Sequence, residues 1–204
     1  MGLSFLMVTL FFLGTVAPSH AWLIYHKPEF KGKVIDGETK EPIEGAVVVV
    51  TYSKTTHLPP EAYSSIINVR ETLTDKNGEF YISSYTTMIQ PLSSEDTADF
   101  IIFKPGYGSF PNYRITPPME LSLPAIEEFF SSKIGTEGEI GWDYKTSKKI
   151  KVTFGIVELL KLKTREERLK AITFPSGDVS SKDLPLLYKA INEENKRFGL
   201  GEVQ

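Results

Sequence analysis

Cysteine is absent from this 204-residue chain, and histidine occurs only as His20, His26 and His57. The lack of cysteine excludes disulfide bonds, thiol nucleophiles and thiolate metal ligands. It does not argue against export, because a chain of this length can bury a core that needs no disulfide. The few histidines leave little material for acid–base chemistry at neutral pH.

A clustered basic surface is also lacking. The net charge is −3, and the densest basic stretches are residues 145–151 and 161–170. Glu166 and Glu167 interrupt the second stretch, which is typical of a solvated helix face. Proteins that bind nucleic acid usually present a basic face. We therefore expect no nucleic-acid partner.

Common enzyme motifs are missing as well. The chain has no Gly-x-Ser-x-Gly sequence of the serine hydrolases. The pair Gly106 and Gly108 is too short for a nucleotide-binding loop. The turn that starts at Asp75 does not continue as a calcium loop, because its twelfth position is Thr86 instead of glutamate. We expect no enzyme activity and no cofactor.

The chain starts with an apolar segment. Residues 3–17 are almost continuously apolar, and Pro18 ends the run. Ser19 and Ala21 then fit the small-residue pattern of a signal-peptidase site. We predict that residues 1–21 are a signal peptide, cleaved before Trp22. The segment has no Lys or Arg and apolar character resumes at residues 22–25, so an uncleaved membrane anchor is the alternative, with a buried N-terminal segment as a third.

Short strands separated by turns are predicted from Phe30 onward. Four consecutive valines at residues 47–50 indicate a strand that is buried on both sides or lies between sheets. Either Val48 and Val50 or Val47 and Val49 should face the interior of a sandwich. The predicted strands cover residues 30–35, 46–52, 69–74, 79–82, 99–104 and 150–160.

Other residues complete this prediction. Phe80, Ile102 and Phe103 are expected in the same core as the valines. A tight turn at residues 75–78 should join two strands, with Gly78 supplying a positive φ. Residues 83–98 are polar and contain a proline, so we expect a loop there.

Two helices are predicted near the end of the chain. Thr164 and Glu167 match a capping box for a short helix to about residue 171. A second helix should start at a cap formed by Ser181 or Asp183 and end before Gly199. Its apolar stripe should pack against the sandwich, and the alternative is that it binds a partner. The stripe consists of Leu184, Leu187, Tyr188 and Ile191.

The strand pattern without strand–helix alternation favours a mostly β sandwich. Three motifs in order resemble the carboxypeptidase regulatory-like domain family. They are Phe30-x-Gly32-x-Val34-x-Asp36 with Thr39 and Pro42-Ile43-x-Gly45-Ala46-x-Val48, then Thr72-x-Thr74-Asp75-x-Asn77-Gly78-x-Phe80, and Lys104-Pro105-Gly106-Tyr107.

This resemblance implies a seven-stranded Greek-key β-sandwich of the transthyretin-like (prealbumin-like) type over residues 28–160. The sequence departs from the family in two places. Residues 116–147 look like an insertion before the last strand, and their own sequence suggests a short helix at residues 125–131. Residues 161–204 would be a C-terminal helical extension. The resemblance implies a fold and not an activity, because such modules are accessory parts in many settings.

A metal site is not expected. Carboxypeptidases bind zinc through a His-x-x-Glu pair and a distant histidine, and His26 and Glu29 have this spacing. Pro28 lies between them, and His57 would have to complete the site from a proline-rich loop. Zinc needs three protein ligands held in a fixed geometry.

The sequence therefore predicts an exported, non-catalytic binding or structural module of the cell envelope, periplasmic or extracellular. One alternative is an assembly or adhesion subunit that docks by strand or loop contacts, with residues 22–25 as donor segment. The other is an enzyme on the same sandwich. The partner would be an envelope protein or a glycan, and a membrane only if the N-terminal segment stays uncleaved. The candidate binding residues are Tyr107, Phe110, Tyr113 and Trp142.

Overall fold

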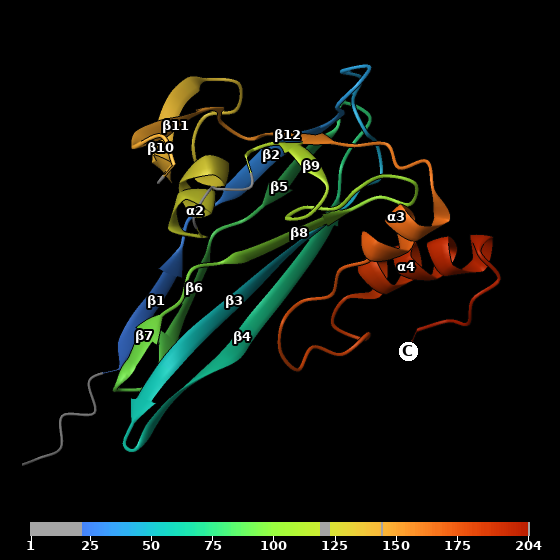
Figure 1. Ribbon diagram of the computed structural model, residues 1–204. Helices are drawn as coiled ribbons and strands as arrows, with labels where there is room; N and C mark the ends of the chain where they lie inside the picture. The colour runs from blue at the N-terminus through green and yellow to red at the C-terminus, as the bar shows by residue number, and fades with distance from the viewer. Residues whose placement is uncertain (1–21, 119–122, 144, 204) are drawn as a thin grey trace, which may run out of the picture.

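The computed structural model describes residues 22–118, 123–143 and 145–203, so the predicted signal peptide lies outside the described residues. The described protein is mostly β, with helices beside the sheets (Figure 1). The strands are β1 Leu23–Lys27, β2 Phe30–Asp36, β3 Val47–Leu58, β4 Glu61–Leu73, β5 Glu79–Ile82, β6 Tyr85–Ile89, β7 Ser93–Glu95, β8 Asp99–Phe103, β9 Arg114–Thr116, β10 Glu137–Asp143, β11 Lys148–Thr153 and β12 Ile156–Leu159. The helices are α2 Leu123–Ser131, α3 Arg165–Lys170 and α4 Pro185–Arg197.

Among the described residues, the strands form two sheets and two ribbons. One sheet has the order β5-β2-β12-β9, and in it β12 runs parallel to β2. The other has the order β4-β3-β7, and β8 also pairs with β3. The inner faces of both sheets share one core, to which β2 contributes Val34, β12 contributes Val157 and β3 contributes Val48. Two antiparallel ribbons, β1-β6 and β10-β11, extend this arrangement.

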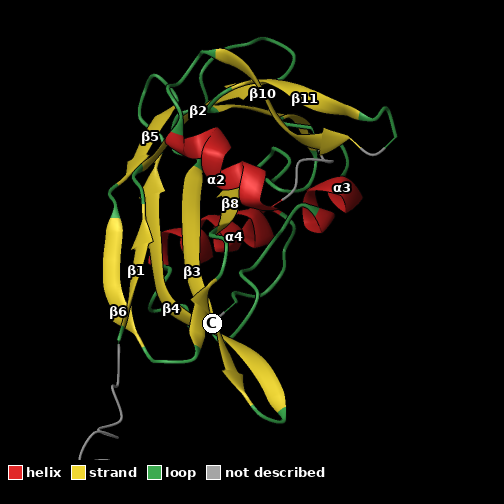
Figure 2. Cartoon of the chain, turned by 90° about the vertical axis from the view of Figure 1, so that its left-hand side faces the viewer, coloured by secondary structure: helices red, strands yellow, loops and turns green. Residues whose placement is uncertain are grey.

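The four valines of β3 are buried on both faces, as predicted. Val48 and Val50 point into the core between the sheets. Val47 and Val49 point to the opposite face, where they form a second core with α4. Phe103 of β8 belongs to this second core, so the expectation that it shares a core with Phe80 and Ile102 was wrong. Figure 2 shows that α2 and α4 lie on opposite faces of the sheet that contains β3. Neighbouring residues of β8 point to opposite faces, so Ile102 enters the main core and Phe103 enters the core with α4.

Helix α2 closes the main core with aromatic side chains. The ring of Phe130 lies between 4.5 and 5.7 Å from four other rings, measured between centroids. Those rings belong to Phe80, Phe100, Phe110 and Phe129. The helix predicted near residues 125–131 is thus confirmed, and it is a part of the core.

The C-terminal helix packs against the sheet, which confirms the prediction for its apolar stripe. Leu184, Leu187 and Ile191 are fully buried against β3 and β8. The tail is tied down further by Arg168 of α3, whose guanidinium makes two hydrogen bonds of 2.6 Å to the buried carboxylate of Glu194. Because isolated helices of this length are marginal, this packing stabilises α4.

The caps of the two C-terminal helices differ from each other. Helix α3 has the predicted capping box between Thr164 and Glu167. Helix α4 does not use the predicted caps, since Asp183 instead accepts hydrogen bonds from Ser180, and Ser181 makes no side-chain cap. At the start of α4, the backbone N–H groups of Leu186 and Leu187 donate to the carboxylate of Glu71 on β4, at 2.7 and 3.0 Å. A carboxylate at this end of a helix is favourable because the end carries partial positive charge.

Two strand predictions were wrong. Residues 83–98 are not a loop, because β6 and β7 lie within them and β6 pairs with β1 over five residue pairs. The strand predicted at residues 150–160 is two strands, β11 and β12. Gly155 separates them with φ +69°, a conformation that residues with a side chain seldom adopt. The turn at residues 75–78 is confirmed, with φ +75° at Gly78.

Candidate functional site

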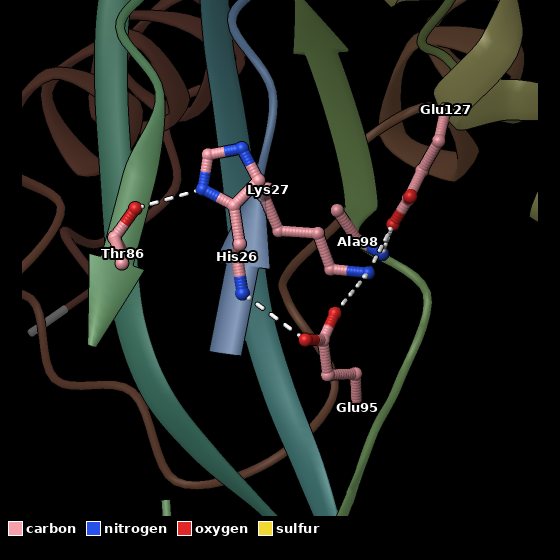
Figure 3. Close-up of polar contacts among 6 residues, drawn as sticks. All are labelled: His26, Lys27, Thr86, Glu95, Ala98 and Glu127. Atoms are coloured by element: carbon pink, nitrogen blue, oxygen red, sulfur yellow. Dashed lines mark hydrogen bonds and ion pairs between the residues drawn. The ribbon is translucent and has the colours of Figure 1, made fainter. Parts of the chain in front are cut away.

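A buried lysine of β1 joins this strand to β7 and α2 (Figure 3). Lys27 of β1 follows Tyr25 at a spacing of two, and both side chains therefore point inward. Its Nζ lies 2.8 Å from Oε1 of Glu127 on α2 and 3.7 Å from Oε2 of Glu95 on β7. A lysine is seldom buried unless it is paired.

The partner carboxylates make further contacts in the same cluster. Glu95 accepts a hydrogen bond of 3.1 Å from the backbone N–H of His26, and Glu127 accepts one from the backbone N–H of Ala98. Figure 3 shows that both acids face Lys27 from opposite sides. A catalytic amine must be free to react in its neutral form. Lys27 is instead held in ion pairs, so this cluster fixes β1 to β7 and α2.

Two tyrosines pack beside this cluster. Tyr25 and Tyr52 are fully buried, and their rings lie 5.9 and 4.9 Å from the ring of Tyr85. Burial, followed by the nearby charge of Glu127, raises the pKa of Tyr25 above its ordinary value. Burial likewise raises the pKa of Tyr52 to about 12. Both hydroxyls therefore stay protonated at neutral pH, and these rings act as packing groups.

A groove lies on the outer side of the same region. It has a volume of about 840 Å³ and is lined by parts of β3 and β4, by the segment from Glu95 of β7 to Asp99 at the start of β8, and by residues 176–178. Its charged groups are the four carboxylates of Glu95, Asp96, Asp99 and Asp178, and its other polar groups are mainly serine hydroxyls. No Lys, Arg or His is among the described residues that line it. We call it the acidic groove.

The carboxylates of the acidic groove influence one another. Partial burial, and then the charge of Asp96, raise the pKa of Asp99 above its ordinary value. Asp96 also accepts a hydrogen bond of 2.8 Å from the hydroxyl of Thr55. The described side chains that line the groove are half-buried or exposed, so water reaches them. This arrangement attracts cations and hydrogen-bond donors.

The aromatic residues predicted as a binding site are placed differently from one another. Tyr107 is half-buried, and its hydroxyl donates a hydrogen bond of 3.1 Å to Asp36. Phe110 is only 2% exposed, because its ring packs against Phe130 on one side and the guanidinium of Arg114 covers it at 4.4 Å. Phe110 is therefore a core residue.

Tyr113 and Trp142 are nearer to solvent. Tyr113 is half-buried and has φ +53° in the turn before β9. Trp142 is 46% exposed on the β10-β11 ribbon. Since Phe110 lies inside the core, the structure does not bring the four predicted side chains to one surface. Binding by Tyr113 and Trp142 stays a prediction.

The sequence reasoning missed the acidic groove. Three of its acids, Glu95, Asp96 and Asp99, stand close together in the sequence, and this spacing was a usable signal. A loop at residues 83–98 and a strand from Asp99 do not by themselves indicate that these acids face one groove. Asp178 comes from the tail, and only the packing of the tail brings it to the others.

The residues considered for zinc do not form a site. The ring of His26 hydrogen-bonds to Thr86 at 2.8 Å, Glu29 pairs with Lys31 at 3.0 Å, and the ring of His57 bonds to a serine hydroxyl. Across the described ranges, no group of three or more His, Cys, Asp or Glu side chains is arranged to hold a metal ion.

Comparison with known proteins adds no assignment. No family model matches the chain, and neither a curated protein nor a solved structure shows significant similarity to it. Among the described residues, no helix combines the length and apolar character that a membrane span requires. The functional conclusion therefore rests on the geometry of the chain itself.

Proposed function

We propose that the protein is an exported, non-catalytic binding module of the cell envelope, with the acidic groove as its binding surface. The observation that supports this most directly is the composition of the groove. Four carboxylates from two segments, residues 95–99 and Asp178, line one volume without a cation among the lining residues, and Glu95 is at the same time paired with Lys27 at 3.7 Å. Such a surface favours a positively charged partner, because charge-assisted hydrogen bonds to carboxylates are strong and selective.

Recognition fits the groove better than catalysis. The pair Asp96 and Asp99 would serve an enzyme, since a raised pKa beside a second carboxylate is a feature of acid–base sites. Large electrostatic catalysis, however, needs a site that excludes water. The lining side chains of this groove are open to solvent, and Lys27 is held in ion pairs nearby.

Export is supported by how the chain enters the domain. The apolar residues 3–17 are followed within six positions by β1, which begins at Leu23. A cleavage before Trp22 would release a domain that is folded almost from its first residue. We therefore place the protein in the periplasm or outside the cell, with an uncleaved anchor as the alternative.

We further infer that the sandwich is of the transthyretin-like type, in the carboxypeptidase regulatory-like family. Support comes from the local chemistry of the three motifs. Gly45 takes φ +67° just before β3, and Asp75 accepts hydrogen bonds from the backbone N–H groups of Asn77 and Glu79 in its own turn. These are the conformations that the motif residues favour.

The partner that we propose is a basic segment of an envelope protein. A glycan would also find acceptors in the groove, and the experiment below separates the two. An assembly subunit that donates residues 22–25 is less well supported. Leu23, Ile24 and Tyr25 already pair with β6 of the same chain, so their backbone groups on that side are used.

A pull-down from envelope extract tests the proposal. The double variant Asp99→Asn/Asp178→Asn should lose the retained protein, because it removes two negative charges at nearly constant volume. The matched control Glu61→Gln/Glu202→Gln removes two exposed charges outside the groove and should retain it. Retention should also fall in 1 M salt, where the Debye length is about 3 Å. Equal retention by both variants would contradict the proposal, and retained glycan without protein would reassign the partner.

A further inference from the structure

One end of the molecule exposes large apolar side chains from four separate parts of the sequence. They come from the start of β1, the end of β6, the loop that follows it and the end of β3. Their exposed fractions are 57%, 71%, 46%, 67% and 62% for Trp22, Ile24, Leu58, Met88 and Leu92. We call this set the apolar end. Scattered apolar residues on a surface are normal, whereas a group of this kind marks an interaction site.

The β1-β6 ribbon creates the first half of the apolar end. Ile24 lies directly opposite Met88 in the antiparallel register. Their neighbours Tyr25 and Ile89 point to the other face and are buried. Because side chains alternate along a strand, burial of Tyr25 and Ile89 turns Ile24 and Met88 outward together. Trp22 lies two positions before Ile24.

Leu92 connects this ribbon to the tip of β3. Its carbonyl accepts a hydrogen bond of 2.8 Å from the backbone N–H of His57, which precedes Leu58. Leu92 also has φ +63°, a conformation that is uncommon for residues other than glycine. The fold thus holds an apolar side chain in solvent at a strained position, and strain of this kind is typical of functional surfaces.

The charges around the apolar end indicate which kind of surface it can bind. Residues 22–26, 55–64 and 86–95 contain no Lys or Arg, but they contain Glu61 and Glu95. The apolar end therefore lacks the cluster of basic side chains that would favour an anionic surface. Tryptophan is favoured at the boundary between lipid and water because its ring is apolar and its N–H is polar. Both features fit a neutral lipid surface.

The place where the chain enters the domain also favours a lipid surface. Figure 1 shows β1 starting at the end of the molecule where the tip of the β3-β4 hairpin lies, and both views place the entry of the chain there. The sequence just before Trp22 contains the uncharged, apolar residues 3–17. A segment of this kind meets a bilayer during export or remains in it. The apolar end is therefore the part of the domain nearest to lipid.

We propose that the apolar end docks on the surface of a lipid bilayer with zwitterionic headgroups, with Trp22, Ile24, Met88 and Leu92 in the interface. The inference rests on the proposed envelope location. Docking would orient the domain with the β10-β11 ribbon and the C-terminal helices away from the membrane (Figure 1). The acidic groove would then lie at the side of the domain, open to partners near the surface.

The experiment uses single thiols, which the cysteine-free chain makes unambiguous. The protein is purified from its host with the N-terminus that it carries there. Leu92→Cys is labelled with an environment-sensitive fluorophore and mixed with phosphatidylcholine vesicles. Position 92 is far from the N-terminus in sequence, so its signal reports docking of the folded domain. Lys76→Cys, in an exposed turn at the other end of β4, is the control.

We expect the emission at position 92 to shift to shorter wavelength with vesicles and the emission at position 76 to stay unchanged. Vesicles with anionic lipid should give no stronger shift. Adding Ile24→Glu/Met88→Glu should reduce the apparent lipid affinity by about tenfold or more, since two apolar contacts are lost. The matched double variant Leu73→Glu/Leu200→Glu, at exposed positions elsewhere, should bind as before.

Two results would overturn the proposal. One is an unchanged emission at position 92 at saturating lipid. The other is a shift that appears without lipid and grows with protein concentration, which would assign the apolar end to a second copy of the chain. The labelled Leu92→Cys protein gives an answer even where the glutamate variants do not fold. An exported protein that ignores vesicles would leave the proposed function standing, because export is measured separately.

Discussion

The hydroxyl of Tyr107 donates a hydrogen bond of 3.1 Å to Oδ2 of Asp36, and so links the loop after β8 to the end of β2. Oδ1 of Asp36 accepts the backbone N–H groups of Glu38 and Thr39 at 2.8 and 3.0 Å. Burial opposes ionisation of Asp36, but these hydrogen bonds outweigh it and hold the pKa of this carboxyl below its ordinary value. This hydrogen bond gives Tyr107 a structural role.

The first prediction follows from this low pKa. Asp36→Asn should lower the free energy of unfolding at pH 7, because the ionised carboxylate is better bonded in the folded state. A depressed pKa gives stability that is present above the unfolded pKa of about 3.9 and is lost as the pH falls through the folded pKa. The difference between variant and wild type should therefore shrink below about pH 4. Tyr107→Phe should cost about 1.5 kcal/mol at pH 7. Urea unfolding at pH 7 and pH 3 measures both, and a pH-independent difference would refute this assignment.

Removing either partner of the ion pair between Lys27 and Glu127 should destabilise the protein, but by different amounts. Glu127→Gln leaves the buried ammonium with only the more distant Glu95, and we expect a loss of about 2–4 kcal/mol. Lys27→Met should cost less, because Glu127 keeps its backbone partner and remains partly exposed. Thermal and urea unfolding of both variants measure which variant loses more stability. A larger loss for Lys27→Met would show that the carboxylate, and not the lysine, is the group that needs compensation.

Asp99 should respond in the opposite sense to Asp36. Its pKa is raised by partial burial and by Asp96, so its ionised form is less favourable in the folded state. A raised pKa in an acid makes stability fall as the pH rises from the unfolded pKa through the folded pKa. Asp99→Asn should therefore stabilise the protein at pH 7, with no gain below about pH 4. Asp143→Asn serves as control, since hydrogen bonds lower the pKa of Asp143 and its loss should not stabilise.

The C-terminal tail should be required for stability. A chain that ends at Thr173 lacks α4 and leaves Val47, Val49 and Phe103 of the second core in water. It also loses the partner of Arg168. We expect lower solubility and a large fall in the melting temperature. The point variant Leu187→Ala should cost about 2–5 kcal/mol, as other buried leucines do. Unchanged melting of both proteins would mean that α4 is an interaction arm.

The parts of the fold that were predicted correctly are those with strong local patterns. Four consecutive valines required cover on both faces of β3, and the stripe on α4 supplies it on one face. The capping box at Thr164 and the turn at Gly78 also follow from neighbouring residues alone. Local chemistry decides such features, so a single sequence reveals them.

The parts that failed depend on contacts between distant residues. The ribbon β1-β6 forms because residues 23–27 pair with residues 85–89. The second segment, Tyr-Thr-Thr-Met-Ile, favours a strand, but it is short and polar residues flank it on both sides. The cap of α4 comes from Glu71, more than one hundred positions earlier. Phe110 lies in a turn-rich segment and still points into the core, because α2 offers Phe130 as a neighbour. The acidic groove needs the tail to fold back before Asp178 can join it.

A single thiol measures most directly whether the folded domain lies outside the cytoplasm. Lys76→Cys would carry the only cysteine of the chain, in an exposed turn. Cells with an intact cytoplasmic membrane are treated with a maleimide that cannot cross this membrane, before and after lysis. We predict full labelling before lysis and a mature chain that begins at Trp22. Labelling only after lysis, with the wild-type chain unlabelled throughout, would place the domain in the cytoplasm and contradict its role in the envelope.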